Sequence, residues 1–167
     1  MAETYNILSL DLGSTLGWAL VQDNTILQSG TVALFRKDAH PGDRFVRFNN
    51  WLVQMVQDHE IAEIIYEDVP RFESAKAARV YCGLLCVVQM LCLTHAKRMT
   101  NIKPGSVKKE FCGNGNADKA EMCKTAHRLG WKHGHPGLDI DHDEADALAV
   151  AWVILQRRGI DPALAAL

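Results

Sequence analysis

Three short apolar runs, separated by polar and turn-forming residues, occupy the first 35 positions of the chain. Runs of this length predict strands at 5–10, 16–22 and 25–35. Asp23-Asn24, between the second and third runs, is a hairpin turn signal. The chain is therefore expected to open with three antiparallel strands, the first of which leads into Asp11.

Helical and strand patterns alternate along the rest of the chain. Apolar residues three or four positions apart, from Phe45 to Val56, predict a helix over 43–59. A strand over 61–66 leads into Glu67, and a helix over 74–99 is apolar on more than one face, as buried helices are. The remaining expected elements are a strand at 100–102, a helical turn at Pro104, a helix over 117–129 and a last helix over 143–158.

This order of elements predicts a single α/β domain, 1–167, with a mixed sheet covered by helices. No repeat, low-complexity tract or linker in the sequence indicates a second domain. A right-handed strand–helix–strand connection would make the first and fourth strands parallel neighbours. Asp11 and Glu67 would then share the carboxyl-terminal edge of the sheet, where open α/β sheets bind ligands.

Composition favours a cytoplasmic protein that needs no disulfide. The 167 residues are 48% hydrophobic, enough for an ordinary core, and the N-terminus lacks a secretory pattern. The longest apolar stretch, over 80–93, is too interrupted for a membrane span. The five cysteines are interpreted as reduced, buried thiols, although Cys82 and Cys86, one helical turn apart, leave a zinc site open. His133 and His135 are interpreted as solvated loop residues.

Charge is unevenly distributed along the chain although its net value is only −2. From Lys97 to Lys132 there are nine Lys or Arg residues against three acidic ones. A run of acids follows, without Lys or Arg among them: Asp139, Asp141, Asp143, Glu144 and Asp146. The first segment could hold phosphates and the second concentrates negative charge, although two ordinary solvated surfaces would give the same pattern.

Four carboxylates are candidates for a metal site: Asp11, Glu67, Asp143 and Asp146. The first two follow apolar strands, and the last two are three apart at the start of a helix, where they can share a face. Such a cluster repels itself unless divalent cations occupy it, and all-oxygen ligands favour Mg²⁺ or Mn²⁺. Taken singly, each could be a turn or helix-capping residue. Asp139 and Asp141 could compete for the last metal position, whereas Asp68 should face the opposite side from Glu67.

Several segments resemble motifs of the RuvC Holliday-junction resolvases, a branch of the ribonuclease H-like fold. Residues 7–19, ILSLDLGSTLGWA, resemble the first-strand hairpin of that family, and 65–69, IYEDV, its second acidic motif. Residues 143–149, DEADALA, are similar to the last motif, and 102–109 and 115–119 to the basic segment. The similarity covers about residues 7–152 in the correct order.

The resemblance implies a ribonuclease H-like mixed five-stranded sheet flanked by helices. It also implies a homodimer, paired through the helix over 74–99, that nicks four-way DNA junctions and uses no nucleotide cofactor. Asp11, Glu67, Asp143 and Asp146 match the family's metal-binding acids, for two Mg²⁺ ions per site with Mn²⁺ as a substitute. Lys108 and Lys119 match lysines that approach the DNA backbone. A bacterial cell or a phage-infected host would be the setting.

A mechanism by two-metal-ion phosphodiester hydrolysis follows from these assignments as a hypothesis. Lys119 would place positive charge near the scissile phosphate, while Lys108, Lys109 and Arg71 would hold backbone phosphates. Phe72 would serve as the family's aromatic wedge at a shifted position, which favours looser cleavage of branched DNA.

Three other functions remain open from the sequence. Asp11-Leu12-Gly13-Ser14-Thr15 also resembles the phosphate loop of actin-like nucleotide-binding proteins, although the chain is too short for both of their domains. A related ribonuclease H-fold nuclease would act on RNA or flap substrates instead. A catalytically silent DNA-binding module would not require the complete set of acids.

Overall fold

The chain opens with an antiparallel meander of three strands, β1 (Asn6–Asp11), β2 (Thr15–Gln22) and β3 (Thr25–Ala33). Asp23 and Asn24 connect β2 to β3 with φ angles of 48° and 63°. Two-residue hairpins of type I′ have this left-handed conformation at both positions because it matches the twist of the strands. The hairpin predicted from this residue pair is confirmed.

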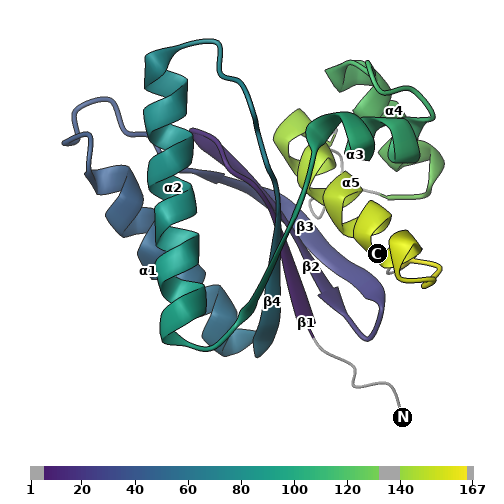
Figure 1. Cartoon of the computed structure of the whole chain (residues 1–167), viewed down its shortest axis with the longest axis horizontal. Coiled ribbons are helices and arrows are strands. Elements are labelled where there is room, and N and C mark those ends of the chain that lie inside the picture. Colours follow the sequence, from purple (N-terminus) through teal and green to yellow (C-terminus); the bar gives the residue numbers. More distant parts are fainter. Residues whose placement is uncertain (1–5, 132–139, 165–167) are drawn as a thin grey trace.

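The computed structural model describes residues 6–131 and 140–164, and its strands form one mixed sheet (Figure 1). β4 (Ile61–Glu67) pairs in parallel with β1, and β5 (Arg98–Ile102) in parallel with β4. The strand order is β5-β4-β1-β2-β3-β6, in which β6 (Ala163–Leu164) adds two residues beside β3. The expected five strands and the parallel pairing of the first and fourth are confirmed, and β6 extends the sheet.

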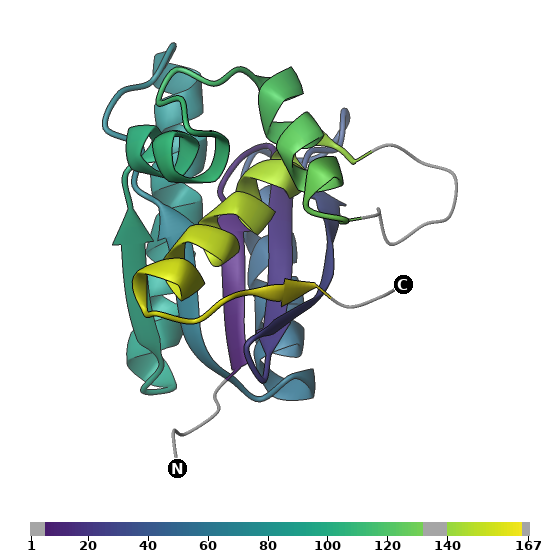
Figure 2. The same ribbon diagram turned by 90° about the vertical axis from the view of Figure 1, so that its right-hand side faces the viewer.

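Helices cover both faces of the sheet. α1 (Asp43–Asp58) and α2 (Ala75–Thr94) lie on one face. α3 (Pro104–Cys112), α4 (Lys119–Arg128) and α5 (His142–Arg157) lie on the other, where α5 crosses the strands diagonally (Figure 2). Successive residues of a strand point to opposite faces. Leu8 and Leu10 of β1 therefore pack under α1 and α2, while Ile7 packs under α5.

The helix predicted over 74–99 is shorter than expected. It ends at Thr94, Ala96 has a left-handed φ of 51°, and β5 begins at Arg98 rather than at 100. The residues from Arg98 onward pair with β4, so sheet formation ends the helical run. Pro104 begins a complete helix, α3, rather than a single turn.

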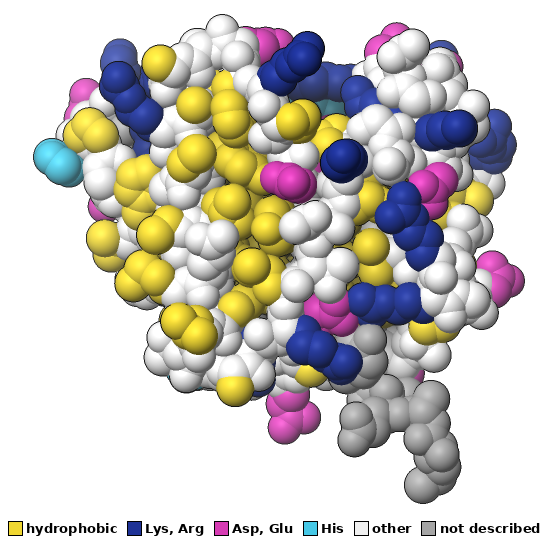
Figure 3. Space-filling model, in the orientation of Figure 1, with side chains coloured by type: hydrophobic (Ala, Val, Ile, Leu, Met, Phe, Trp, Pro, Cys, Tyr) yellow, Lys and Arg dark blue, Asp and Glu magenta, His cyan; other side chains and the backbone are white. Residues whose placement is uncertain are grey.

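The expectation that all five thiols are buried is wrong for Cys82 and Cys86. Both lie exposed on the outward face of α2, whereas Cys92 is buried and the other two are half-buried. Met90 and Leu93 of the same helix are 64% and 87% exposed. Figure 3 shows the apolar surface over α1 and α2 to which this face belongs. By length and composition, α2 is also the one described helix that could span a membrane. His133 and His135 lie outside the described residues.

Candidate functional site

Two acidic residues lie side by side at the carboxyl-terminal edge of the central strands. Leu10 of β1 is paired with Tyr66 of β4 in parallel register, so the next residues, Asp11 and Glu67, end neighbouring strands. Neighbouring strands are about 4.8 Å apart. Tyr81 of α2 fixes the end of β4 by donating its hydroxyl to the backbone oxygen of Glu67, at 2.7 Å.

A glycine lets the start of α5 come directly against this edge. Gly17 of β2 is paired with Asp11, and a Cβ atom on Gly17 would lie 1.8 Å from the backbone oxygen of Asp143. No larger residue fits there without moving the helix. The Ser9 hydroxyl also donates to the backbone oxygen of Ala147, at 2.6 Å, and holds α5 on β1. The first turn of α5 is thus fixed beside the end of β1.

The four candidate carboxylates act on one another electrostatically. Burial raises the pKa of Asp11 well above its ordinary value, and the charges of Asp146, Glu67 and Asp143 raise it further. Burial and the charge of Asp146 raise the pKa of Glu67 to about 7. The pKa of Asp146 rises to about 6, mainly through burial, and burial also raises the pKa of Asp143. At this edge burial and mutual repulsion therefore make ionised carboxylates more costly than free ones unless positive charge is supplied.

Two lysines supply part of that charge. Lys108 of α3 lowers the pKa of both Glu67 and Asp146, and Lys119 lowers that of Asp11, although burial outweighs these effects. Lys119 begins α4, and its Nζ lies 3.3 Å from each ring nitrogen of His142. Both lysines consequently face the cluster of acids.

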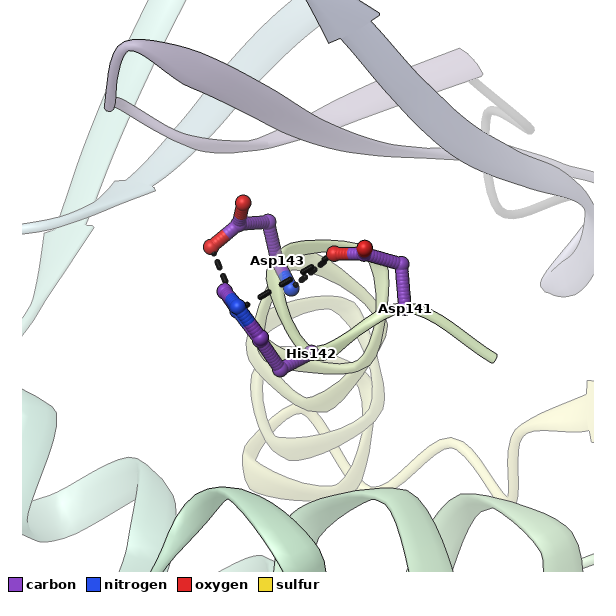
Figure 4. A group of neighbouring side chains, drawn as sticks. All are labelled: Asp141, His142 and Asp143. Atoms are coloured by element: carbon purple, nitrogen blue, oxygen red, sulfur yellow. Dashed lines mark hydrogen bonds and ion pairs between the residues drawn. The ribbon is translucent and has the colours of Figure 1, made fainter. Parts of the chain in front are cut away.

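His142 is a candidate ligand that the sequence reasoning missed. Its Nδ1 lies 2.7 Å from Oδ1 of Asp143 and 3.9 Å from Oδ1 of Asp141 (Figure 4). Ligand atoms of these three residues lie within 4.8 Å of one another, so they could hold a metal ion together. The sequence did offer a signal for His142, because it lies between Asp141 and Asp143. The assumption of an all-oxygen ligand set left it out.

The remaining candidates are placed as follows. Arg71 and Lys109 are exposed, and Phe72 packs half-buried against Tyr81, with ring centres 5.2 Å apart. Asp141 accepts the backbone N–H of Asp143 at 2.9 Å and so caps α5.

Glu144, next to Asp143 in the sequence, lies in the interior and not in the acidic cluster. Glu144 is fully buried and accepts hydrogen bonds from the Ser29 hydroxyl and from Trp131 Nε1. Asp68 is exposed beyond the end of β4, and Asp139 lies outside the described residues. Glu144 therefore belongs to the interior beneath α5.

Sequence comparison finds relatives that are named crossover junction endodeoxyribonuclease RuvC. No family model matches the chain. Crossover junction endodeoxyribonuclease RuvC of Anaeromyxobacter dehalogenans is 31% identical over 157 residues, which cover 91% of this chain and 81% of the relative. The protein of the same name from Anaeromyxobacter sp. is 32% identical over 133 residues, which cover 80% of this chain but only 62% of the relative.

Solved structures share the fold. RuvC of Thermus thermophilus, solved in complex with a Holliday junction substrate, matches with a TM-score of 0.74 at 19% identity, over 93% of this chain and 96% of that one. The yeast mitochondrial Holliday junction resolvase Ydc2 matches with a TM-score of 0.66 at 14% identity, over 89% and 76%. The expected ribonuclease H-like sheet flanked by helices is therefore confirmed.

Proposed function

Because the chain belongs to the RuvC family, we propose that it is an endonuclease that cuts four-way junctions and other branched DNA. One observation carries the proposal: carboxylates from β1, β4 and α5 meet at one sheet edge and raise one another's pKa. Isolated turn or capping residues would have no reason to converge there. A site for cations accounts for the convergence.

The donor atoms fit divalent cations. Carboxylate oxygens suit Mg²⁺ and Mn²⁺, and cations would offset the burial and the mutual repulsion that raise the pKa values of the cluster. If the His142 imidazole joined the set, preference would move toward transition metals. When bound, two such ions would lower the pKa of the attacking water and stabilise the departing oxygen.

The chain's own residues would hold and orient the reacting groups. Asp11, central in the cluster, would contact both cation positions, while Glu67 and the Asp143/Asp146 pair would complete them. Lys119 would add positive charge near the scissile phosphate. Lys108 faces the cluster and would bind the adjoining phosphate.

Other side chains would bind the DNA farther from the cluster. Lys109 and Arg71, both exposed, would hold backbone phosphates, a contribution that weakens as salt rises. Phe72 would stack on a base at the branch point. These contacts would set the position of the junction and leave cleavage to the acidic edge.

The outward face of α2 would bind a second copy of the chain. Cys82, Cys86, Met90 and Leu93 form an exposed apolar stripe at helical spacing, and such a surface usually has a partner. A two-fold dimer would present two acidic edges to one junction, as symmetric nicking requires. The cytoplasm of a bacterium or of a phage-infected host would provide the DNA.

Incubation with a synthetic four-way junction, with and without Mg²⁺, tests the proposed function. We expect cleavage only with Mg²⁺, and no cleavage by Asp146→Asn, which should still bind the junction because its shape hardly changes. Asp58→Asn makes the same chemical change on the opposite helical layer, beyond the cluster, and should cleave normally. Full activity of Asp146→Asn would refute the site. Preferred cleavage of flap or RNA substrates would identify a related nuclease instead.

A further inference from the structure

A hollow of about 370 Å³ lies beside the acidic edge, and none of the proposed metal ligands lines it. It is formed where β3 ends and where α1 and α2 begin. Its walls are made by six residues: Ser14, Thr15, Ala33, Phe35, Arg44 and Lys76. We call it the Phe35 hollow, because this aromatic ring is 55% exposed, which is unusual for so large an apolar side chain.

Cationic side chains accompany the ring. The Arg44 guanidinium lies 5.7 Å from the centre of the Phe35 ring, and its Nε donates to the backbone oxygen of Pro41 at 3.2 Å. Its Nη1 is shielded and has no acceptor among the residues that the structure describes. Lys76, in the first turn of α2, is exposed. The hollow thus offers a guanidinium, an exposed ammonium group and an aromatic face.

The surrounding segment is basic as well. Between Phe35 and Arg47 the chain carries four arginines or lysines against two aspartates, and Arg36 lines a smaller adjoining hollow. Figure 3 shows Lys and Arg side chains along the upper rim of the molecule, above the apolar surface of α1 and α2. A ligand of this hollow should therefore be an anion with a flat apolar part. A nucleotide unit of DNA has both features.

The position of the hollow relative to the acidic edge favours the same DNA that is cut there. Ser14 lines the Phe35 hollow and also a neighbouring hollow of about 180 Å³ that contains Phe72. Ser14 follows Asp11 by three residues, which span at most about 10 Å. A DNA strand advances about 3.4 Å per nucleotide, so Ser14 at the wall of the Phe35 hollow lies within about three nucleotides of Asp11. The Leu34 N–H donates to the Ser14 oxygen at 3.2 Å and fixes this turn.

We propose that the Phe35 hollow binds the DNA strand that leaves the acidic edge across the β1–β2 turn. Arg44 and Lys76 contact its phosphates, and the Phe35 ring stacks on one unpaired base. This DNA-binding role of the Phe35 hollow rests on the proposed function. It adds to the proposed contacts of Arg71 and Phe72 a further DNA contact on the α1–α2 side of the sheet, opposite the basic helices α3 and α4. It also predicts a preference for junctions whose bases open near the branch point.

Binding to a four-way junction, measured by fluorescence anisotropy at several salt concentrations in the Asp146→Asn background, tests the proposal. Lys76→Ala should reduce the slope of log affinity against log salt by about one, because one phosphate contact is lost. Phe35→Ala should weaken binding about tenfold at every salt concentration, because stacking carries no counterion release. Lys97→Ala is the matched control, because this lysine precedes β5 at the edge of the sheet opposite the acidic edge; it should change neither the salt slope nor the affinity.

Abasic substitutions locate the stacked base. An abasic nucleotide at one of the three positions next to the cleavage point should weaken binding by the parent but not further weaken binding by Phe35→Ala. If the parent binds junctions and Phe35→Ala and Lys76→Ala bind equally well, the Phe35 hollow is refuted and the proposed function stands. If the parent binds no junction, both the Phe35 hollow as a DNA site and the proposed function are refuted. A change of oligomeric mass in Phe35→Ala, with DNA binding intact, would assign the hollow to a protein contact and also refute the proposal.

Discussion

Gly17→Ala tests how the acidic edge is built. A Cβ atom at this position would lie 1.8 Å from the backbone oxygen of Asp143 and 2.4 Å from its carbonyl carbon. Real Cβ atoms essentially never come within 3.0 Å of other atoms. The atoms in the way belong to the backbone, which cannot rotate aside as a side chain can. To lengthen this contact from 1.8 Å to 3.0 Å, the start of α5 must move away from β2 by about 1.2 Å.

This displacement has two separable effects. Overpacking costs about 1–3 kcal/mol, and each kcal/mol lowers Tm by about 2–4 °C in a chain of this size. Asp143 and Asp146 move with α5, whereas Asp11 stays on β1. A misplacement of about 1 Å can cost about 10²-fold in rate. We therefore expect a moderate loss of stability and a much larger loss of cleavage.

Single-turnover cleavage of a four-way junction, well below the Tm of both proteins, measures the loss of rate, and thermal unfolding measures the loss of stability. Gly30→Ala is the matched control, because the three atoms nearest to its Cβ all belong to the Trp18 side chain, at 3.2 Å or more. It should cleave nearly as fast as the parent. The reasoning is refuted if Gly17→Ala retains the parent rate, or if Gly30→Ala loses as much activity.

Three further predictions concern stability. The folded pKa of Glu67, about 7, lies above its ordinary 4.5, so the stability it contributes is complete at low pH and is lost as pH rises through 7. The metal-free Tm should therefore fall between about pH 5 and 8, and less steeply in Glu67→Gln. Glu63→Gln should cost about 1.5–3 kcal/mol in chemical denaturation, because it removes the charge that the partly buried Arg158 guanidinium contacts at 2.7 Å, and an unchanged midpoint would contradict this. Gly83→Ala should lower Tm because its Cβ would lie 2.3 Å from the Phe45 ring, and Phe45→Leu should restore part of the loss.

Local sequence patterns predicted the strands of the N-terminal half correctly but did not predict where α2 ends. Asp23-Asn24 tolerates the left-handed backbone angles that a tight hairpin turn needs, and apolar runs bounded by turns leave few alternatives to strands. After Thr94, by contrast, come Ala96, Lys97, Arg98 and Met99, all strong helix formers. Pairing of β5 with β4 overrides that propensity. A long-range contact of this kind leaves no mark in the local sequence.

Some residues of the candidate site could likewise be placed from the sequence, and others could not. Asp11 and Glu67 could be placed at one edge because both follow strands whose parallel pairing topology predicts. The contact of His142 with Asp143 depends on the rotation of the first turn of α5, which spacing alone does not fix. The exposure of Cys82 could not be predicted either. A helix that is apolar all round does not reveal which face remains outside.

The contrast between two glutamates of β4 gives the most direct support to the proposed cation site. Glu63 and Glu67 are four residues apart on one strand and so lie on the same face, beneath α5. Burial raises the pKa of both, but at Glu63 hydrogen bonds from Arg158 and Thr100 outweigh it and the pKa ends below its ordinary value. At Glu67 the charge of Asp146 adds to burial, and the pKa rises to about 7. The protein neutralises one carboxylate with its own arginine at the end of α5 and surrounds the other with further acids at the start of the same helix. A carboxylate with a purely structural role would be paired as Glu63 is, so the contrast supports the proposal that Glu67 is a metal ligand.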